Sequence, residues 1–203
     1  MESSAASPRT KPSEAHLHKG RLRRLNPLAY VGRACVHWSM PLEHRATGWL
    51  DDLMHVRLRE ILLHACVRYS LACPVYCLMP DHAHFLIMGI GDTADQRPAM
   101  RMLRRQWTSL LPPGIELQRQ GYDHVLREDE RARGAFEGTA YYILENPVRA
   151  GLVADLSAWP YAGSLVPGYP SLDPRAPEFW ASFWLAHEAA SSQHVAAGAF
   201  YSE

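Results

Sequence analysis

The sequence predicts an α+β fold in which helices cover a small antiparallel sheet, close to a ferredoxin-like split βαβ arrangement. Three observations lead to this class. Apolar residues recur at helical spacing between residues 50 and 69, and two apolar runs at 71–79 and 82–90 are separated by only two residues. The predicted elements follow the order strand, helix, strand, strand, helix, strand, helix, with short connections.

The first strand is predicted over 28–40, where LAYVGRACVHWSM combines β-branched, aromatic and small residues and stops before Pro41. A helical pattern then opens at Thr47, with most charged residues outside its apolar positions. Those positions are Leu50, Leu53, Met54, Leu58, Ile61, Leu62, Ala65, Cys66 and Tyr69. They predict an amphipathic helix that packs against the sheet.

The runs LACPVYCLM at 71–79 and HAHFLIMGI at 82–90 predict a hairpin. Pro80 and Asp81 lie between them, and both residue types are good turn formers. The two strands of this hairpin should therefore be neighbours in the sheet.

The second half of the fold should contain an arginine-rich helix over 95–111 and a short strand over 122–127. A further helix is expected from Asp129. It should end near Asn146, because Pro147 disfavours helical geometry at the residue before it.

Composition limits the class of protein. The 203 residues are 47% hydrophobic and 21% charged, which is typical of a globular domain. Four cysteines are too few for a disulfide scaffold, and no apolar run approaches the ~20 residues that cross a bilayer. We therefore expect a cytoplasmic protein with reduced thiols and no membrane partner.

The charge distribution divides the chain unevenly. The formal net charge is zero, but residues 1–151 carry +4 and residues 152–203 carry −4. We expect a mobile basic N-terminal arm over 1–24, one domain over 25–165, and a C-terminal extension over 166–203 packed on that domain, with a last helix near 178–190. Basic residues of the arm, Arg21, Arg23 and Arg24, are candidates for contact with a phosphate backbone.

A histidine pair is the first candidate functional feature. His82 and His84 are two residues apart at the start of a predicted strand, so their side chains should point to the same face. Neighbouring neutral imidazoles form a ready pair of ligands for a divalent metal. Two partly exposed histidines at a turn remain the alternative, since the chain has 11 histidines.

The second feature is the segment TAYYILENPVRAGLV at 139–153. Tyr142 and Asn146 are four residues apart and share a helix face, whereas Tyr141 diverges from Asn146 by about 140°. A phenol with a pKa near 10 is a weak nucleophile, but beside a metal that polarises a phosphate it can attack phosphorus. Asn146 could then supply an oxygen ligand, and core packing of the tyrosines is the alternative.

Together these segments resemble the REP-associated tyrosine transposases, bacterial relatives of the single-tyrosine transposases with an HUH (histidine, hydrophobe, histidine) site. The matching strings are MPDHAHFLI, QGYDHVLREDE and YYILENPVRAGLV, and the resemblance runs from about residue 25 to 165, including WPYAGS. Ala83 is smaller than the usual hydrophobe, and Asp81 replaces a common Asn. Neither change alters the imidazoles.

The resemblance implies an HUH endonuclease type of fold and a metal-dependent endonuclease and strand transferase. The implied substrate is single-stranded or hairpin-forming DNA, and the implied intermediate is a 5′-phosphotyrosine. Matched motif by motif, it makes His82 and His84 ligands of Mg²⁺ or Mn²⁺, Asn146 the third ligand, and Tyr142 the nucleophile. Whether a monomer or a homodimer forms the site stays open.

An arginine stripe on the helix predicted over 95–111 is a further candidate for DNA contact. It consists of Arg97, Arg101, Arg104 and Arg105. A solvated helix face explains the same pattern equally well.

Two rival functions remain. In the first, Cys73 and Cys77, which should share a strand face, join His82 and His84 in a zinc-structured interaction module. In the second, a domesticated protein keeps the fold and binds hairpin DNA without cutting it. Zinc content distinguishes the first rival and a nicking assay the second.

Overall fold

The computed structural model of the protein describes residues 25–128, 130 and 134–200, with the side chains of 194–200 excepted. Arg21, Arg23 and Arg24 lie outside these residues. The strands are β1 (Cys35–Pro41), β2 (Leu71–Met79), β3 (His82–Gly89), β4 (Tyr122–Leu126) and β5 (Ala162–Leu165). The helices are α1 (Asp52–Arg68), α2 (Gln96–Leu110), α4 (Ala135–Arg149) and α5 (Phe179–Phe200), and three short 3₁₀ turns are η1 (Pro27–Tyr30), η2 (Glu43–Arg45) and η3 (Leu156–Ala158).

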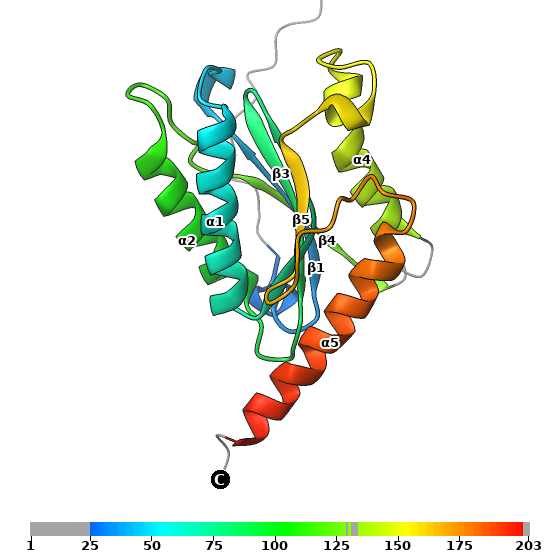
Figure 1. Ribbon diagram of the computed structural model, residues 1–203. Coiled ribbons are helices and arrows are strands. Elements are labelled where there is room, and N and C mark those ends of the chain that lie inside the picture. Colours follow the sequence, from blue (N-terminus) through cyan, green and yellow to red (C-terminus); the bar gives the residue numbers. More distant parts are fainter. Residues whose placement is uncertain (1–24, 129, 131–133, 201–203) are drawn as a thin grey trace, which may run out of the picture.

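The five strands form one antiparallel sheet in the order β4-β1-β3-β2-β5 (Figure 1). The succession β1-α1-β2-β3-α2-β4 with this strand order is the ferredoxin-like arrangement. The predicted fold class is therefore confirmed. The short strand β5 was not predicted, and it adds a fifth strand at the β2 edge.

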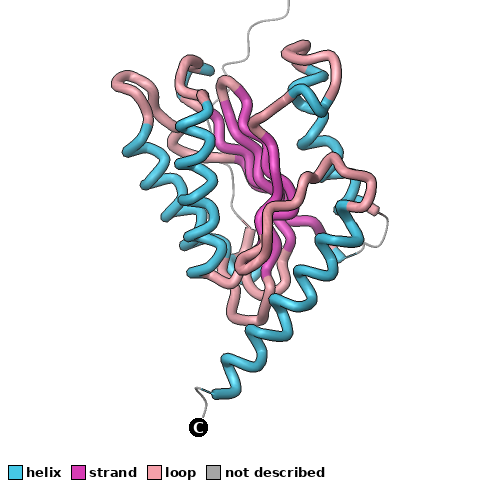
Figure 2. Tube along the Cα trace, viewed as in Figure 1, coloured by secondary structure: helices cyan, strands magenta, loops and turns pink. Residues whose placement is uncertain are grey.

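Two helical layers cover the sheet, one on each face (Figure 2). α1 and α2 pack on one face, where every second strand residue enters a core cluster that includes Trp38, Phe85 and Leu78. α4 and α5 pack on the other face, over a cluster that includes Leu86 and Phe183. The C-terminal segment thus contributes to the core of the sheet.

In the part of the chain that the structure describes, no helix is both long and apolar enough to span a membrane.

The turn between β2 and β3 is held from outside the hairpin. The indole Nε1 of Trp49 donates to the carbonyl of Pro80 at 2.6 Å, and the backbone N–H of Leu42 donates to the carbonyl of Asp81 at 3.0 Å. Arg45 forms an ion pair with the Asp81 carboxylate at 3.0 Å. These contacts fix the point at which β3 begins.

The predicted starts of the first strand and the first helix are wrong for local reasons. β1 begins at Cys35 rather than at residue 28, because Asn26 caps a 3₁₀ turn that Pro27 opens, and Gly32 with φ of 66° follows. The helix expected from Thr47 begins at Asp52, because the Asp51 carboxylate accepts from the N–H of Met54 at 2.7 Å. The last helix extends over 179–200 rather than 178–190.

The two cysteines of the zinc hypothesis do not share a face. Cys73 lies in the cluster under α1 and α2, whereas Cys77 lies in the cluster under α4 and α5. The register of β2 shifts between Ala72 and Val75, and such a bulge reverses the alternation of side chains. Cys73 and Cys77 are therefore unsuited to hold one zinc ion together.

The helix expected to end near Asn146 continues to Arg149, with Pro147 inside it. Proline has no N–H, so the carbonyl of Ile143 loses its usual donor four residues on. The side-chain Nδ2 of Asn146 donates to the carbonyls of Ile143 at 3.2 Å and of Tyr142 at 2.9 Å. A side chain thus replaces the missing backbone donor, and the helix continues past the proline.

This replacement can be tested by a double-mutant cycle. Asn146→Ala should lower the free energy of unfolding by about 1 kcal/mol, because the Ile143 carbonyl loses its donor. In a Pro147→Ala background the backbone N–H of residue 147 becomes that donor, and Asn146→Ala should then cost little. Urea unfolding of the four proteins measures both penalties. Equal penalties in the two backgrounds would show that Asn146 does not compensate for Pro147.

Candidate active site

His82 and His84 occupy alternate positions at the start of β3, and their side chains point to the face that α4 covers. Their Nε2 atoms are 3.0 Å apart. The expected placement on one face is confirmed. Two nitrogens bound at right angles to one ion with bonds of about 2.1 Å would be separated by about 3.0 Å, so the spacing fits adjacent ligands of a divalent metal.

Neighbouring side chains orient both imidazoles. The Nδ1 of His82 lies 2.5 Å from Oδ1 of Asp81, so an Nδ1–H that donates to this carboxylate leaves the Nε2 lone pair free. Nδ1 of His84 lies 3.0 Å from Nε2 of His37. With His84 donating from Nδ1, both Nε2 atoms of the pair present lone pairs to the same point.

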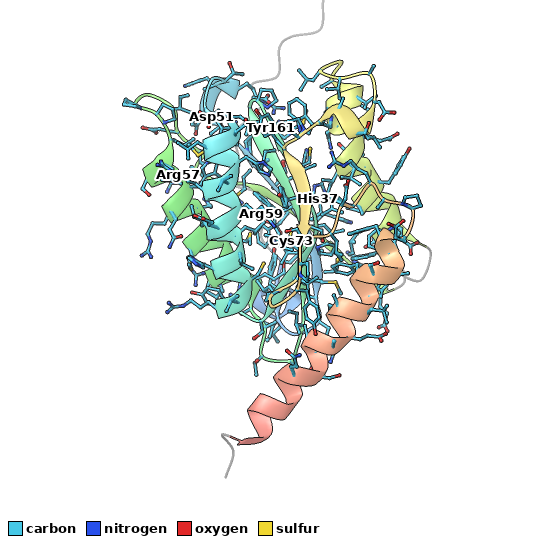
Figure 3. The ribbon with its side chains drawn as sticks, viewed as in Figure 1. His37, Asp51, Arg57, Arg59, Cys73 and Tyr161 are labelled. Carbon is cyan, nitrogen blue, oxygen red and sulfur yellow. The ribbon has the colours of Figure 1, made fainter. Side chains whose placement is uncertain are left out.

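His37 is a member of this cluster that the sequence did not single out. It lies on β1, and Figure 3 places it on the side of the sheet that α4 covers. Burial, with a smaller contribution from His124, lowers its pKa to about 4. Burial, followed by the charges of His82, His37 and Arg45, lowers the pKa of His84 to about 3. Neutral imidazole is the form that binds metals.

Tyr142 projects from α4 toward the histidines. The centroid of its ring lies 6.2 Å from that of His37 and 6.3 Å from that of His84, and the residue is 42% exposed. Tyr141 points elsewhere: it is 56% exposed, and hydrogen bonding to Glu145 raises its pKa. Of the two adjacent tyrosines, the structure brings Tyr142 to the histidine pair.

Arg149 is a second residue that the sequence did not indicate. Its guanidinium carbon lies 4.6 Å from the centroid of the Tyr142 ring, in the range of a cation–π contact. The two residues are seven apart, or about two helical turns, on the same side of α4. This contact exists only because α4 continues past Pro147.

Asn146 lies one turn beyond Tyr142, and the recorded hydrogen bonds of its side chain both use Nδ2. Its Oδ1 remains the atom that could act as a ligand. Within the described residues, no three His, Cys, Asp or Glu side chains come together as a metal site. Among the described residues, a third protein ligand beside His82 and His84 would therefore be of another type, such as this amide oxygen.

The arginine stripe of α2 lies across the sheet from the histidines, on the face that α1 and α2 cover (Figure 1). Arg97 pairs with Asp95 at 3.2 Å. Arg104 donates to the carbonyl of Gln118 at 2.6 Å and so holds the segment before β4. Arg101 and Arg105 are exposed. The stripe is thus separated from the histidine pair by the sheet, and two of its members, Arg97 and Arg104, bind other groups of the protein.

A ferredoxin-like sheet with two facing histidines and a tyrosine from a covering helix is the arrangement that the REP-associated tyrosine transposase resemblance implies. No model of a known protein family matches the chain. A curated protein of Haemophilus influenzae, which carries the provisional name REP-associated tyrosine transposase, is 26% identical over 141 residues, covering 62% of this chain and 76% of that protein.

A solved structure of a REP-associated tyrosine transposase bound to a REP hairpin shares the fold. Its TM-score is 0.57 at 21% identity, and the match covers 70% of this chain and 81% of that chain. The resemblance to REP-associated tyrosine transposases is thus confirmed by a relative in sequence and by a neighbour in fold.

Proposed function

We propose that this protein is a transposase: a metal-dependent endonuclease and strand transferase that acts on single-stranded, hairpin-forming DNA through a 5′-phosphotyrosine at Tyr142. The observation that carries the proposal is the position of the Tyr142 ring beside the paired Nε2 atoms of His82 and His84. The named relative and the hairpin-bound neighbour support it. As a DNA enzyme similar to a bacterial protein, it would work in the cytoplasm.

His82, His84 and Oδ1 of Asn146 would hold Mg²⁺ or Mn²⁺. When bound, the ion would supply Lewis-acid polarisation of a phosphate oxygen. An Nδ1–H that His82 donates to Asp81, and one that His84 donates to His37, would leave both Nε2 atoms free for the ion. These contacts also fix the ring orientations before DNA arrives.

Tyr142 performs the covalent step in this proposal. Its phenol oxygen attacks the phosphorus and loses its proton to solvent, while the bond from phosphorus to the 3′ oxygen breaks and that oxygen takes up a proton. The 5′ phosphate is then joined to Tyr142, and a 3′ hydroxyl in the reverse attack can rejoin the strand. Arg149, over the Tyr142 ring, holds the ring and places positive charge beside it.

The decisive experiment incubates the full chain with single-stranded hairpin DNA taken from beside its own gene, with Mg²⁺ or Mn²⁺. A labelled adduct that survives denaturing electrophoresis would support the cutting function. Tight hairpin binding without nicking or adduct would favour the domesticated, non-cutting alternative.

The α2 arginines give a separate prediction about DNA binding. Arg101 and Arg105 are the exposed members of the stripe, so replacing both with Gln should leave folding intact. If each contacts a phosphate, the slope of log affinity against log salt should become less steep by about 0.7 per contact. Fluorescence anisotropy over a salt series measures the slope. An unchanged slope would assign the stripe to a solvated helix face.

A further inference from the structure

A second polar site lies on the opposite face of the sheet from the histidine pair. It is a cavity of about 280 Å³ between α1, the edge strand β5 and the segment at 171–175. Its polar lining comes mainly from His55, Arg59, Tyr76, Ser171 and Arg175. None of these residues takes part in the function proposed above.

The cavity wall places a buried phenol where it can meet a ligand. Tyr76 is 3% exposed, and its hydroxyl lies 3.0 Å from Nε2 of His55. Gly163 makes room for this hydroxyl, because a Cβ there would lie 2.5 Å from the phenol oxygen. Burial raises the pKa of Tyr76 to about 12, so the hydroxyl keeps its proton. When His55 donates its Nε2–H to the phenol oxygen, the hydroxyl proton of Tyr76 is free to point into the cavity.

The charges around the cavity favour an anion. Arg175 is bound to Asp173 at 2.6 Å, and Asp173 is the one carboxylate in the described lining. None of the ion pairs between described residues involves Arg59. Burial lowers the pKa of His55 and the charge of Arg59 lowers it further, while the charge of Asp52 opposes them with a smaller effect. The imidazole therefore stays neutral, beside a guanidinium that forms no ion pair with a carboxylate among the described residues.

We propose that this cavity binds a phosphate group, with the Arg59 guanidinium as its principal donor. A guanidinium presents paired N–H groups that match phosphate oxygens, and the Tyr76 hydroxyl adds a neutral donor. The phosphate comes either from the backbone of a DNA strand or from free phosphate. The DNA source rests on the proposed function.

The sheet register places this cavity within reach of a DNA strand at the histidines. Cys77 on β2 pairs with His84 on one side and with Ala162 on β5 on the other. Adjacent strands are about 4.8 Å apart, so the β5 edge lies about 10 Å across the sheet from His84. A few nucleotides of single strand that pass around this edge would span the separation.

The matched variants are Arg59→Gln and Arg57→Gln. Both arginines are on α1, but side chains two residues apart point in directions about 200° apart around the helix axis. Figure 3 shows Arg59 on the β5 side of α1 and Arg57 on the other side. Arg57 is exposed and does not line the cavity. Calorimetry measures binding of inorganic phosphate, and anisotropy measures binding of hairpin DNA with and without a single-stranded extension.

Arg59→Gln should weaken the binding of at least one of these ligands by about 10-fold or more. Arg57→Gln should weaken the binding of each ligand by less than about 2-fold. Arg59→Lys, which keeps the charge without the paired N–H groups, should give an intermediate loss. If Arg59→Gln weakens the binding of inorganic phosphate alone, free phosphate is the ligand of the cavity. If it weakens only the binding of hairpin DNA with the single-stranded extension, the ligand is a phosphate of the DNA backbone.

Equal effects of the Arg57 and Arg59 variants on every probe, or no effect of either, would overturn the assignment. Phosphate binding that depends on Arg59 in a protein that neither binds nor cuts hairpin DNA would refute the proposed function and leave the phosphate site intact. The thermal unfolding midpoint of each variant, compared with that of the unmodified protein, separates lost binding from lost folding.

Discussion

Tyr142→Phe should abolish the protein–DNA adduct and reduce strand cleavage by about 10⁴-fold or more, because it removes the attacking oxygen. The ring stays, so its contact with the Arg149 guanidinium should persist. Since Tyr142 is 42% exposed, the free energy of unfolding should change by less than about 0.5 kcal/mol. Hairpin binding should be preserved.

Tyr141→Phe is the matched control for this variant. Its hydroxyl is directed to Glu145 rather than to the histidine pair, so cleavage should continue at close to the normal rate. Mass spectrometry of peptides from the trapped adduct locates the attached nucleotide. A nucleotide on Tyr141, or cleavage by the Tyr142 variant, would mean that Tyr142 is not the nucleophile.

Removal of divalent metal should stop cleavage, and His82→Ala should reduce it by at least about 100-fold even with Mg²⁺ or Mn²⁺ present. The loss of stability should be small, about 1 kcal/mol or less, because Asp81 keeps its ion pair with Arg45 when the imidazole is removed. Manganese binding, followed by electron paramagnetic resonance, should weaken in parallel with cleavage.

The exposed histidine His64 on α1 provides the control, and His64→Ala should change neither metal binding nor cleavage. Undiminished cleavage in excess chelator would refute the metal requirement. Loss of cleavage in the His82 variant with unchanged manganese binding would instead assign His82 a role other than ligand.

The features that the sequence predicted well are local ones. The turn at Pro80 and Asp81 requires only two residues, and the common face of His82 and His84 follows from the two-residue period of a strand. The helix face that carries Tyr142 likewise follows from helical spacing. Each of these relations connects residues that are close in the chain.

The features that were missed depend on contacts or irregularities with no spacing rule. His37 reaches His84 only through the pairing of β1 with β3, and nothing near His37 in the chain distinguishes it from the other histidines. The position of Arg149 could not be predicted, because Pro147 indicates that the helix ends before this residue. The helix continues to Arg149 because the Asn146 side chain replaces the missing backbone donor. A strand bulge likewise separates Cys73 from Cys77.

The burial of the four cysteines has a practical consequence for mapping the path of DNA. All four cysteines are buried and none of them forms a disulfide, and burial raises the pKa of Cys66 and Cys77 to about 12 and that of Cys73 well above its usual value. Thiolates are the species that maleimides and activated disulfides attack. A single cysteine introduced at the surface can therefore be coupled selectively to a thiol-modified oligonucleotide without removing the native ones.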